Sequence, residues 1–249
     1  MIYLRTEETQ LSIKSTTMKH LLTTILLLLP AISMWAQHDE TEDEYVDDFV
    51  SVEAIVSRWT DLPLQVYDTY RKATIRNFAQ AFCKQFPDYA PNRNMADYLK
   101  KPGKYTWEDK GYYCGEDVRN GYIKADAGGQ GDYKTEICYW KRKNGHALVG
   151  VLMLKSYEGE QARYALLFYD YDPKTRMMTP DLTVWQQVNG FLHGLRGSCF
   201  IDMPLQGKDI SVCAVYWDPE EDFIYTDYKL RWDGNGFKGA VSKARGKGQ

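Results

Sequence analysis

Residues 136–172 constrain the fold of this chain most strongly, because they contain two β-rich runs separated by an Asn-Gly pair and then a third such run. Asn144 and Gly145 stand between the first two runs. Both central residues of a two-residue type I′ turn need positive φ angles, and the Asn-Gly pair tolerates them best. The segment therefore predicts a β-hairpin at the centre of an antiparallel sheet.

The turn also predicts which residues of the hairpin face each other. Counting outward from the Asn-Gly pair places Tyr139 opposite Gly150 and Trp140 opposite Val149. An aromatic ring opposite a strand glycine covers the backbone that the glycine leaves bare, which supports this pairing. The pairing is a sharp prediction, because a slip of one residue moves every side chain of a strand to the other face.

Two strands of this segment lack the alternation of a half-exposed sheet. Residues 148–154 and 164–171 carry apolar side chains on both alternating faces. Continuous apolar runs are typical of strands that are covered on both sides. A single layer of helix is therefore not enough, and we expect further structure on the second face.

Residues 61–86 carry the clearest helix pattern of the chain. Asp61 is a suitable N-cap, and Pro87 ends the pattern. Aromatic and apolar residues recur at three- and four-residue spacing, and Phe78 and Phe82 are central to this stripe. Such a stripe packs one face of a helix against a broad apolar surface, most simply the sheet.

The order of a helix followed by strands predicts an α+β fold. We expect an N-terminal amphipathic helix packed on an antiparallel meander sheet that is covered on both faces. The alternative is a mainly-β sandwich or barrel with one helix. Residues 210–217 and 223–232 read as later strands, whereas residues 184–188 fit a strand or a helix.

Residues 1–36 are expected to act as a signal peptide. Met18 opens a basic Met-Lys-His stretch, and a short apolar run and small residues follow, as in secretory signals. The polar residues 1–17 do not fit a leader, so we expect the true start to be Met18. Cleavage after Ser33 or Ala36 fits the pattern, and we favour Ala36. A membrane anchor is the alternative, but the apolar run is short for a span.

The rest of the chain divides into three predicted regions. Residues 37–60 form an acidic mobile tail, residues 61–240 a single globular domain, and residues 241–249 a frayed C-terminus. We expect an exported protein, periplasmic or extracellular, with no stable membrane span after signal cleavage. The net charge of −3 provides no basic field for nucleic acid.

The sequence contains no established catalytic motif, and it predicts no cofactor and no metal site. His193 and Cys199 are candidates for a base and a nucleophile, in a glycine-rich stretch that could also form an anion-binding nest. The structural alternative is a crossover between strands, with Cys199 packed as a small hydrophobic residue.

Asp170 and Asp172 form a second candidate catalytic pair. They are two residues apart at a strand end, so both side chains point to one face. Two carboxylates on one face can perform acid–base chemistry. The structural alternative is turn chemistry, because Asp172 precedes a proline.

Four aromatic residues that end strands are candidate ligand-binding residues: Trp140, Tyr171, Trp217 and Trp232. In a meander, the turns after Trp140 and Tyr171 lie at the same end of the sheet. We therefore expect Trp140, Tyr171 and either Trp217 or Trp232 to form a cluster there. Exposed aromatic rings suit a sugar face or a partner loop, whereas buried ones would only close the end of the core.

These observations leave two hypotheses about function. The favoured one is an exported non-catalytic binding or interaction domain for a glycan, a peptide or an envelope protein. The alternative is an exported hydrolase with a site near His193 and Cys199 or near Asp170 and Asp172. An exposed aromatic patch would favour the binding domain. A pocket that combines His193, Cys199 and a carboxylate would favour the enzyme.

Overall fold

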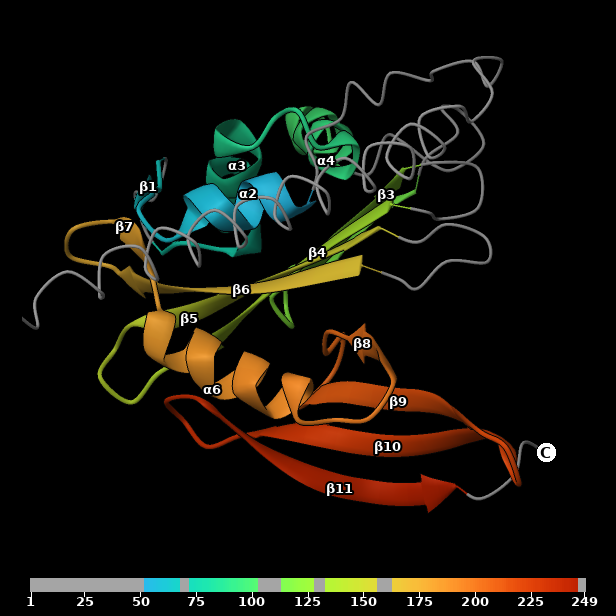
Figure 1. The fold of residues 1–249 in the computed structure, drawn as a ribbon. Coiled ribbons are helices and arrows are strands. Elements are labelled where there is room, and N and C mark those ends of the chain that lie inside the picture. Colours follow the sequence, from blue (N-terminus) through green and yellow to red (C-terminus); the bar gives the residue numbers. More distant parts are fainter. Residues whose placement is uncertain (1–51, 68–71, 103–112, 128–132, 156–162, 246–249) are drawn as a thin grey trace, which may run out of the picture. The chain divides into compact units, whose positions relative to one another are not determined.

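A seven-stranded antiparallel sheet forms the centre of the fold (Figure 1). Six of its strands follow one another as the predicted meander, and a short strand, β1, pairs with β7 at the edge. The strands are β1 (Leu64–Gln65), β2 (Cys114–Asp117), β3 (Tyr122–Ala127), β4 (Tyr133–Lys141), β5 (Ala147–Lys155), β6 (Arg163–Asp172) and β7 (Met177–Pro180).

The computed structural model describes residues 52–67, 72–102, 113–127, 133–155 and 163–245. All of them belong to one compact unit of the chain. The predicted signal peptide and the carboxylate-rich part of the predicted tail lie outside the described residues. Among the described residues, no helix has the length and apolar character needed to cross a membrane.

Three helices cover one face of this sheet, as Figure 1 shows. They are α2 (Val52–Trp59), α3 (Ile75–Gln85) and α4 (Ala90–Lys100). Their apolar side chains form one core with alternate residues of β5, including Val149 and Val151. The predicted burial of Phe78 and Phe82 is confirmed, because these α3 side chains are 1% and 0% exposed.

A second, four-stranded antiparallel sheet and one helix cover the other face (Figure 1). Leu148 and Leu152 of β5 belong to this second core. The prediction that both faces of the central strands are covered is thus confirmed. The elements are α6 (Leu182–His193), β8 (Ser198–Asp202), β9 (Ile210–Asp218), β10 (Asp222–Trp232) and β11 (Phe237–Arg245).

The described residues form two antiparallel sheets and four helices, which fits the predicted α+β class and also the mainly-β alternative. The two strands predicted at 210–217 and 223–232 are confirmed as β9 and β10, and the ambiguous residues 184–188 are helical. Strand β11 extends through residues predicted to be frayed, up to Arg245.

The predicted hairpin register is wrong by one residue. Tyr139 pairs with Val149 and Trp140 with Leu148, because the connection is longer than a two-residue turn. Gly145 has a φ angle of +88°, and its N–H donates to the Arg142 carbonyl oxygen at 3.2 Å. This is the geometry of a three-residue loop with a glycine bulge, in which only the glycine needs a positive φ.

Glycine covering by aromatic rings does occur, but with different partners. A Cβ at Gly150 would lie 2.9 Å from Cζ3 of Trp140, so the Trp140 ring covers this glycine. The Tyr139 ring instead covers Gly121, where a Cβ would lie 2.5 Å from Cε1. Because of the one-residue slip, Trp140 and not Tyr139 lies on the same face of the sheet as Gly150.

The predicted helix over 61–86 is too long at its N-terminal end. Residues after Trp59 turn back, and β1 pairs with β7 before the chain reaches α3. Thr74 is the N-cap of α3, and its backbone N–H donates a 2.9 Å hydrogen bond to the Asn77 side-chain oxygen. Residues 52–59, within the predicted tail, form α2 with a fully buried Trp59.

Candidate functional site

The outer face of the second sheet carries a contiguous group of exposed aromatic side chains, here called the aromatic strip. Along β9, alternate residues Ile210, Val212 and Ala214 are buried against the first sheet, so their neighbours point outward. The outward positions include four large rings. The strip consists of Phe200 (52% exposed), Trp217 (58%), Phe223 (52%) and Tyr225 (37%).

Strand pairing makes these rings neighbours. Trp217 faces Phe223 across the β9–β10 pair, and Tyr225 faces Val215. Phe200 faces Cys213 across the β8–β9 pair, which extends the same face onto a third strand. Residues that face each other in an antiparallel pair lie on the same side of the sheet and within contact distance. The strip therefore lies on one face over β8, β9 and β10, with Cys213 and Val215 of β9 between Phe200 and the rings of β10.

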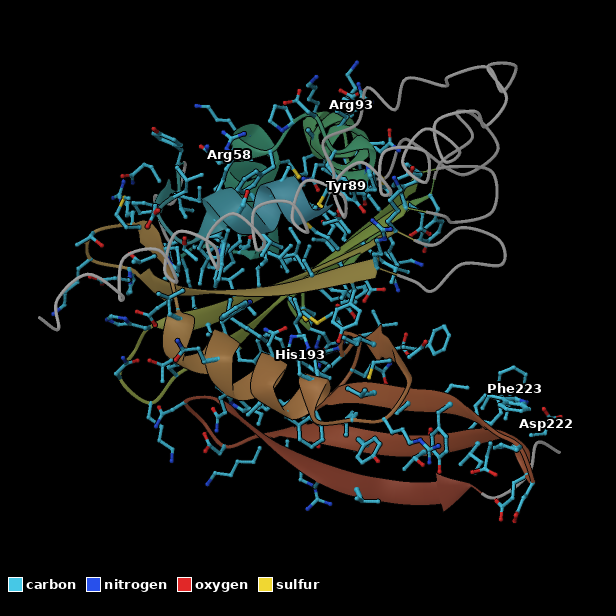
Figure 2. All side chains as sticks on the ribbon, in the orientation of Figure 1. Arg58, Tyr89, Arg93, His193, Asp222 and Phe223 are labelled. Atoms are coloured by element: carbon cyan, nitrogen blue, oxygen red, sulfur yellow. The ribbon has the colours of Figure 1, made fainter. Side chains whose placement is uncertain are left out.

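Acidic residues border the strip at the turn between β9 and β10, here called the acidic turn. Its members are Asp218, Glu220, Glu221 and Asp222. Asp218 Oδ1 accepts a 3.0 Å hydrogen bond from the Glu220 N–H, and Asp222 adopts a φ angle of +70°. Figure 2 labels Asp222 and Phe223 together at this end of the second sheet. Negative charge thus adjoins the Trp217–Phe223 pair.

Basic residues occupy the opposite end of the same face. Lys229 and Arg231 on β10 are exposed, and Lys238 on β11 pairs with Arg231 across the strands. Lys238 also lies 3.6 Å from a carboxylate oxygen of Asp233. The outer face therefore runs from the acidic turn through the aromatic strip to a basic end.

The structure separates the four predicted ligand-binding aromatic residues. Trp140 and Trp232 come together, with ring centroids 5.9 Å apart in a stacked arrangement inside the second core. Tyr171 lies on the opposite face of the first sheet and packs against Phe78. The expected three-residue cluster is therefore wrong for Tyr171, because Trp140 and Tyr171 occupy adjacent, oppositely facing rows of the sheet. Of the four residues, Trp217 alone belongs to the strip.

Phe200, Phe223 and Tyr225 were not among the predicted site residues. The signal for one of them, Phe223, was present in the sequence. Trp217 and Phe223 stand at equal distances from the turn after Asp218, so a hairpin there pairs them. The alternation of buried Ile210 and Val212 would then have assigned both rings to the solvent face.

His193 and Cys199 do line one cavity, of about 720 Å³, beside the C-terminal end of α6. No Asp or Glu is among the described residues that line it. Burial raises the pKa of the Cys199 thiol, which leaves it protonated and weakly nucleophilic at neutral pH. Arg196, in the same glycine-rich stretch, has its guanidinium over the Tyr216 ring at 4.2 Å.

Asp170 and Asp172 point to the same side, as predicted, and both face His146. The His146 Nδ1 lies 2.6 Å from Asp170 Oδ2, and Nε2 lies 3.8 Å from Asp172 Oδ1. Asp172 has a lowered pKa, mainly because its carboxylate accepts the Lys174 backbone N–H. Among the described residues, no group of three or more His, Cys, Asp or Glu side chains is placed to hold a metal ion.

The function of this protein has to be argued from these sites, because fold alone does not specify function. Comparison with protein-family models, with curated proteins and with solved structures finds no match for the chain.

Proposed function

We propose that this protein is an exported, non-catalytic interaction domain, periplasmic or extracellular, that binds a partner protein or peptide through the aromatic strip. The observation that carries the proposal is the contiguous exposure of Trp217, Phe223, Tyr225 and Phe200 on one sheet face. Large contiguous apolar patches are unusual on monomeric soluble proteins and mark interaction sites. Aromatic residues are also the side chains most enriched at protein interfaces.

The composition of the strip favours a protein partner over a glycan. Phe200 and Phe223 have no polar edge that could hydrogen bond to sugar hydroxyl groups, and Val215 adds a purely aliphatic contact between the rings. Apolar side chains of a partner can fill the spaces between such rings, and burying each ring contributes substantially to the free energy of association.

The charges at the two ends of the face give the partner an orientation. The acidic turn suits basic residues of the partner, and Lys229 and Arg231 suit acidic ones. Complementary charges at an interface rim accelerate association and select the register of binding more than they add affinity. We therefore expect binding to weaken modestly and association to slow when the ionic strength rises.

The first test is selection from a phage-displayed peptide library, followed by titration of the selected peptides with wild-type protein and with Trp217→Ala/Phe223→Ala. We expect peptides that combine aromatic or aliphatic residues with basic ones. Removing both rings should weaken binding at least about tenfold, as expected for central interface residues. Stability should change by less than about 0.5 kcal/mol per ring, because both rings are exposed.

Tyr67→Ala is the matched control, because Tyr67 is a comparably exposed aromatic residue on a different part of the fold. It should leave peptide affinity unchanged. Equal affinity of the double variant and the wild type would refute the strip as the binding surface. A glycan would be the ligand instead if the wild-type protein migrated more slowly in gels that contain a soluble polysaccharide and the double variant did not.

A further inference from the structure

A second feature of the molecule is a cavity of about 470 Å³ beside the β4–β5 hairpin, here called the hairpin cavity. It is built by three parts of the chain that are distant in sequence: the segment leading into α3, the hairpin, and the turn between β6 and β7. None of these elements carries the aromatic strip. Its basic lining residues are Lys72, Lys141, Arg142, His146 and Arg176.

The wall of the hairpin cavity has an excess of positive charge. No Asp or Glu is among the described residues that line it. Lys72, Lys141 and Arg176 line the cavity, and none of them has an ion pair with another residue that the structure describes. Three cations that have no ion-pair partner among the described residues, arranged around one concave surface, attract anions.

Arg142 differs from these three cations, because its charge is already compensated. Its guanidinium binds the carboxylate of Asp170, lies 2.5 Å from Asp181 Oδ2, and donates through Nε to the Asn235 carbonyl oxygen at 3.1 Å. The second oxygen of Asp170 is engaged by His146. Both oxygens of Asp170 are therefore used by the wall itself, and this network fixes the hairpin against β6 and α6.

The floor of the hairpin cavity is aromatic and rigid. Phe78 packs edge-on against Tyr139 and Tyr171, with ring centroids 5.3 and 4.9 Å apart. Phe78 and Tyr171 also belong to the first core, so the floor is held by the main packing of the fold. At the mouth, Gly145 has no heavy atom within 4 Å of its Cβ position, which leaves the entrance open on that side.

We propose that the hairpin cavity binds a small organic anion with a phosphate or sulfate ester group and a ring or other apolar body. The side chains of Lys72, Lys141 and Arg176 bind the anionic group, because charge-assisted hydrogen bonds to such oxygens are the strong ones. The ring body packs on the Tyr139 side of the aromatic floor, since small-molecule sites combine an apolar lining with a few convergent polar groups.

Phenyl phosphate is the probe, and phenol and inorganic phosphate are its neutral and ring-free counterparts. Isothermal titration at low ionic strength should show saturable binding of phenyl phosphate, weaker binding of inorganic phosphate and none of phenol at the same concentration. Adding salt should weaken binding, because the cations lie at a solvent-accessible wall. Absence of saturable binding of phenyl phosphate at millimolar concentration would overturn the proposal.

The site is tested with Lys72→Gln/Lys141→Gln, which should bind phenyl phosphate at least about tenfold more weakly. The control is Lys143→Gln/Lys174→Gln, which removes the same charge from exposed residues of the hairpin and the β6–β7 turn that do not line the cavity. The control should bind like the wild type.

Equal losses in both variants would show a general field effect and overturn the assignment. A melting temperature measured for each variant separates loss of binding from loss of fold. If the double variant melts early, the single variant Lys141→Gln takes its place, and unchanged affinity in it would equally refute the role of Lys141.

Discussion

Phe82→Ala should lower the free energy of unfolding by about 3–5 kcal/mol, the range for truncating a fully buried phenylalanine. The Phe82 ring is 0% exposed and lies at the centre of the first core. Its centroid is 5.0 Å from that of Phe86 and 6.3 Å from that of Tyr169 on β6. The variant therefore leaves a cavity between α3 and the first sheet. Urea denaturation followed by circular dichroism measures the loss.

The control for Phe82→Ala is Phe223→Ala, which removes the same ring from the exposed strip. Phe223 is 52% exposed, so its loss should change stability by less than about 0.5 kcal/mol. If the proposed binding surface is correct, the same pair of variants should rank in the opposite order in peptide binding, because Phe223 belongs to the exposed strip and Phe82 is buried. Equal midpoints of denaturation for wild type and Phe82→Ala would contradict the packing of α3 described above.

The covering of both sheet faces could be predicted from the sequence because it depends on composition and not on register. Any pairing of residues 148–154 leaves apolar side chains on each side of β5. Burial of those side chains is the dominant favourable contribution to folding, so two covering layers are required in every arrangement. What the pattern did not reveal is that the second layer is a separate sheet with α6.

The hairpin register could not be predicted from the Asn-Gly pair alone. The pair indicates a turn, but a type I′ turn and a three-residue loop with a glycine bulge both place Gly145 at a positive φ. The choice between them follows from local contacts: Asn144 Oδ1 accepts the His146 N–H at 3.0 Å, and the Arg142 N–H donates to the His146 carbonyl oxygen at 3.0 Å. Side-chain hydrogen bonds of this kind decide loop length without a clear trace in the sequence.

The start of α3 was missed for a tertiary reason. Residues 61–74 have helix-compatible spacing, but β1 gains backbone hydrogen-bonding partners from β7, and the Val66 N–H donates to the Arg176 carbonyl oxygen at 2.9 Å. Pairing with a distant strand overrides a weak local preference. The hairpin cavity could not be predicted for a similar reason, because its lining residues Lys72, Lys141 and Arg176 come from three segments that are far apart in the sequence.

Only the part of the candidate site that depends on the alternation of buried and exposed residues along one hairpin could be predicted from the sequence. The Trp217 and Phe223 positions follow from one hairpin and its alternation. The contact of His146 with Asp170 instead depends on the pairing of β5 with β6 together with the shape of the loop before β5. His146 directly follows the Asn-Gly pair, where an exposed polar residue is expected, and nothing in its neighbours along the chain indicates a carboxylate partner.

Trp140→Ala should destabilise the protein by about 3–5 kcal/mol, as for other buried tryptophans replaced by alanine. Trp140 is 4% exposed and lies between the two sheets, stacked on Trp232 and edge-on to Phe237, whose centroid is 5.0 Å away. Its Nε1 donates a 2.8 Å hydrogen bond to the Lys208 carbonyl oxygen. The substitution removes the ring that joins β4 to the second sheet and uncovers Gly150.

The matched control for Trp140→Ala is Trp217→Ala, because Trp217 is 58% exposed and contacts solvent on the outer face. Acrylamide should quench Trp217 fluorescence readily, and the spectrum lost in Trp140→Ala should be blue-shifted and protected from quenching. If instead Trp140→Ala melts like the wild type and its missing emission is quencher-accessible, Trp140 does not join the sheets, and its role as a ligand-binding residue is restored. If both variants are equally destabilised, the outer face of the second sheet is not free, and the aromatic strip supports the fold in place of binding a partner.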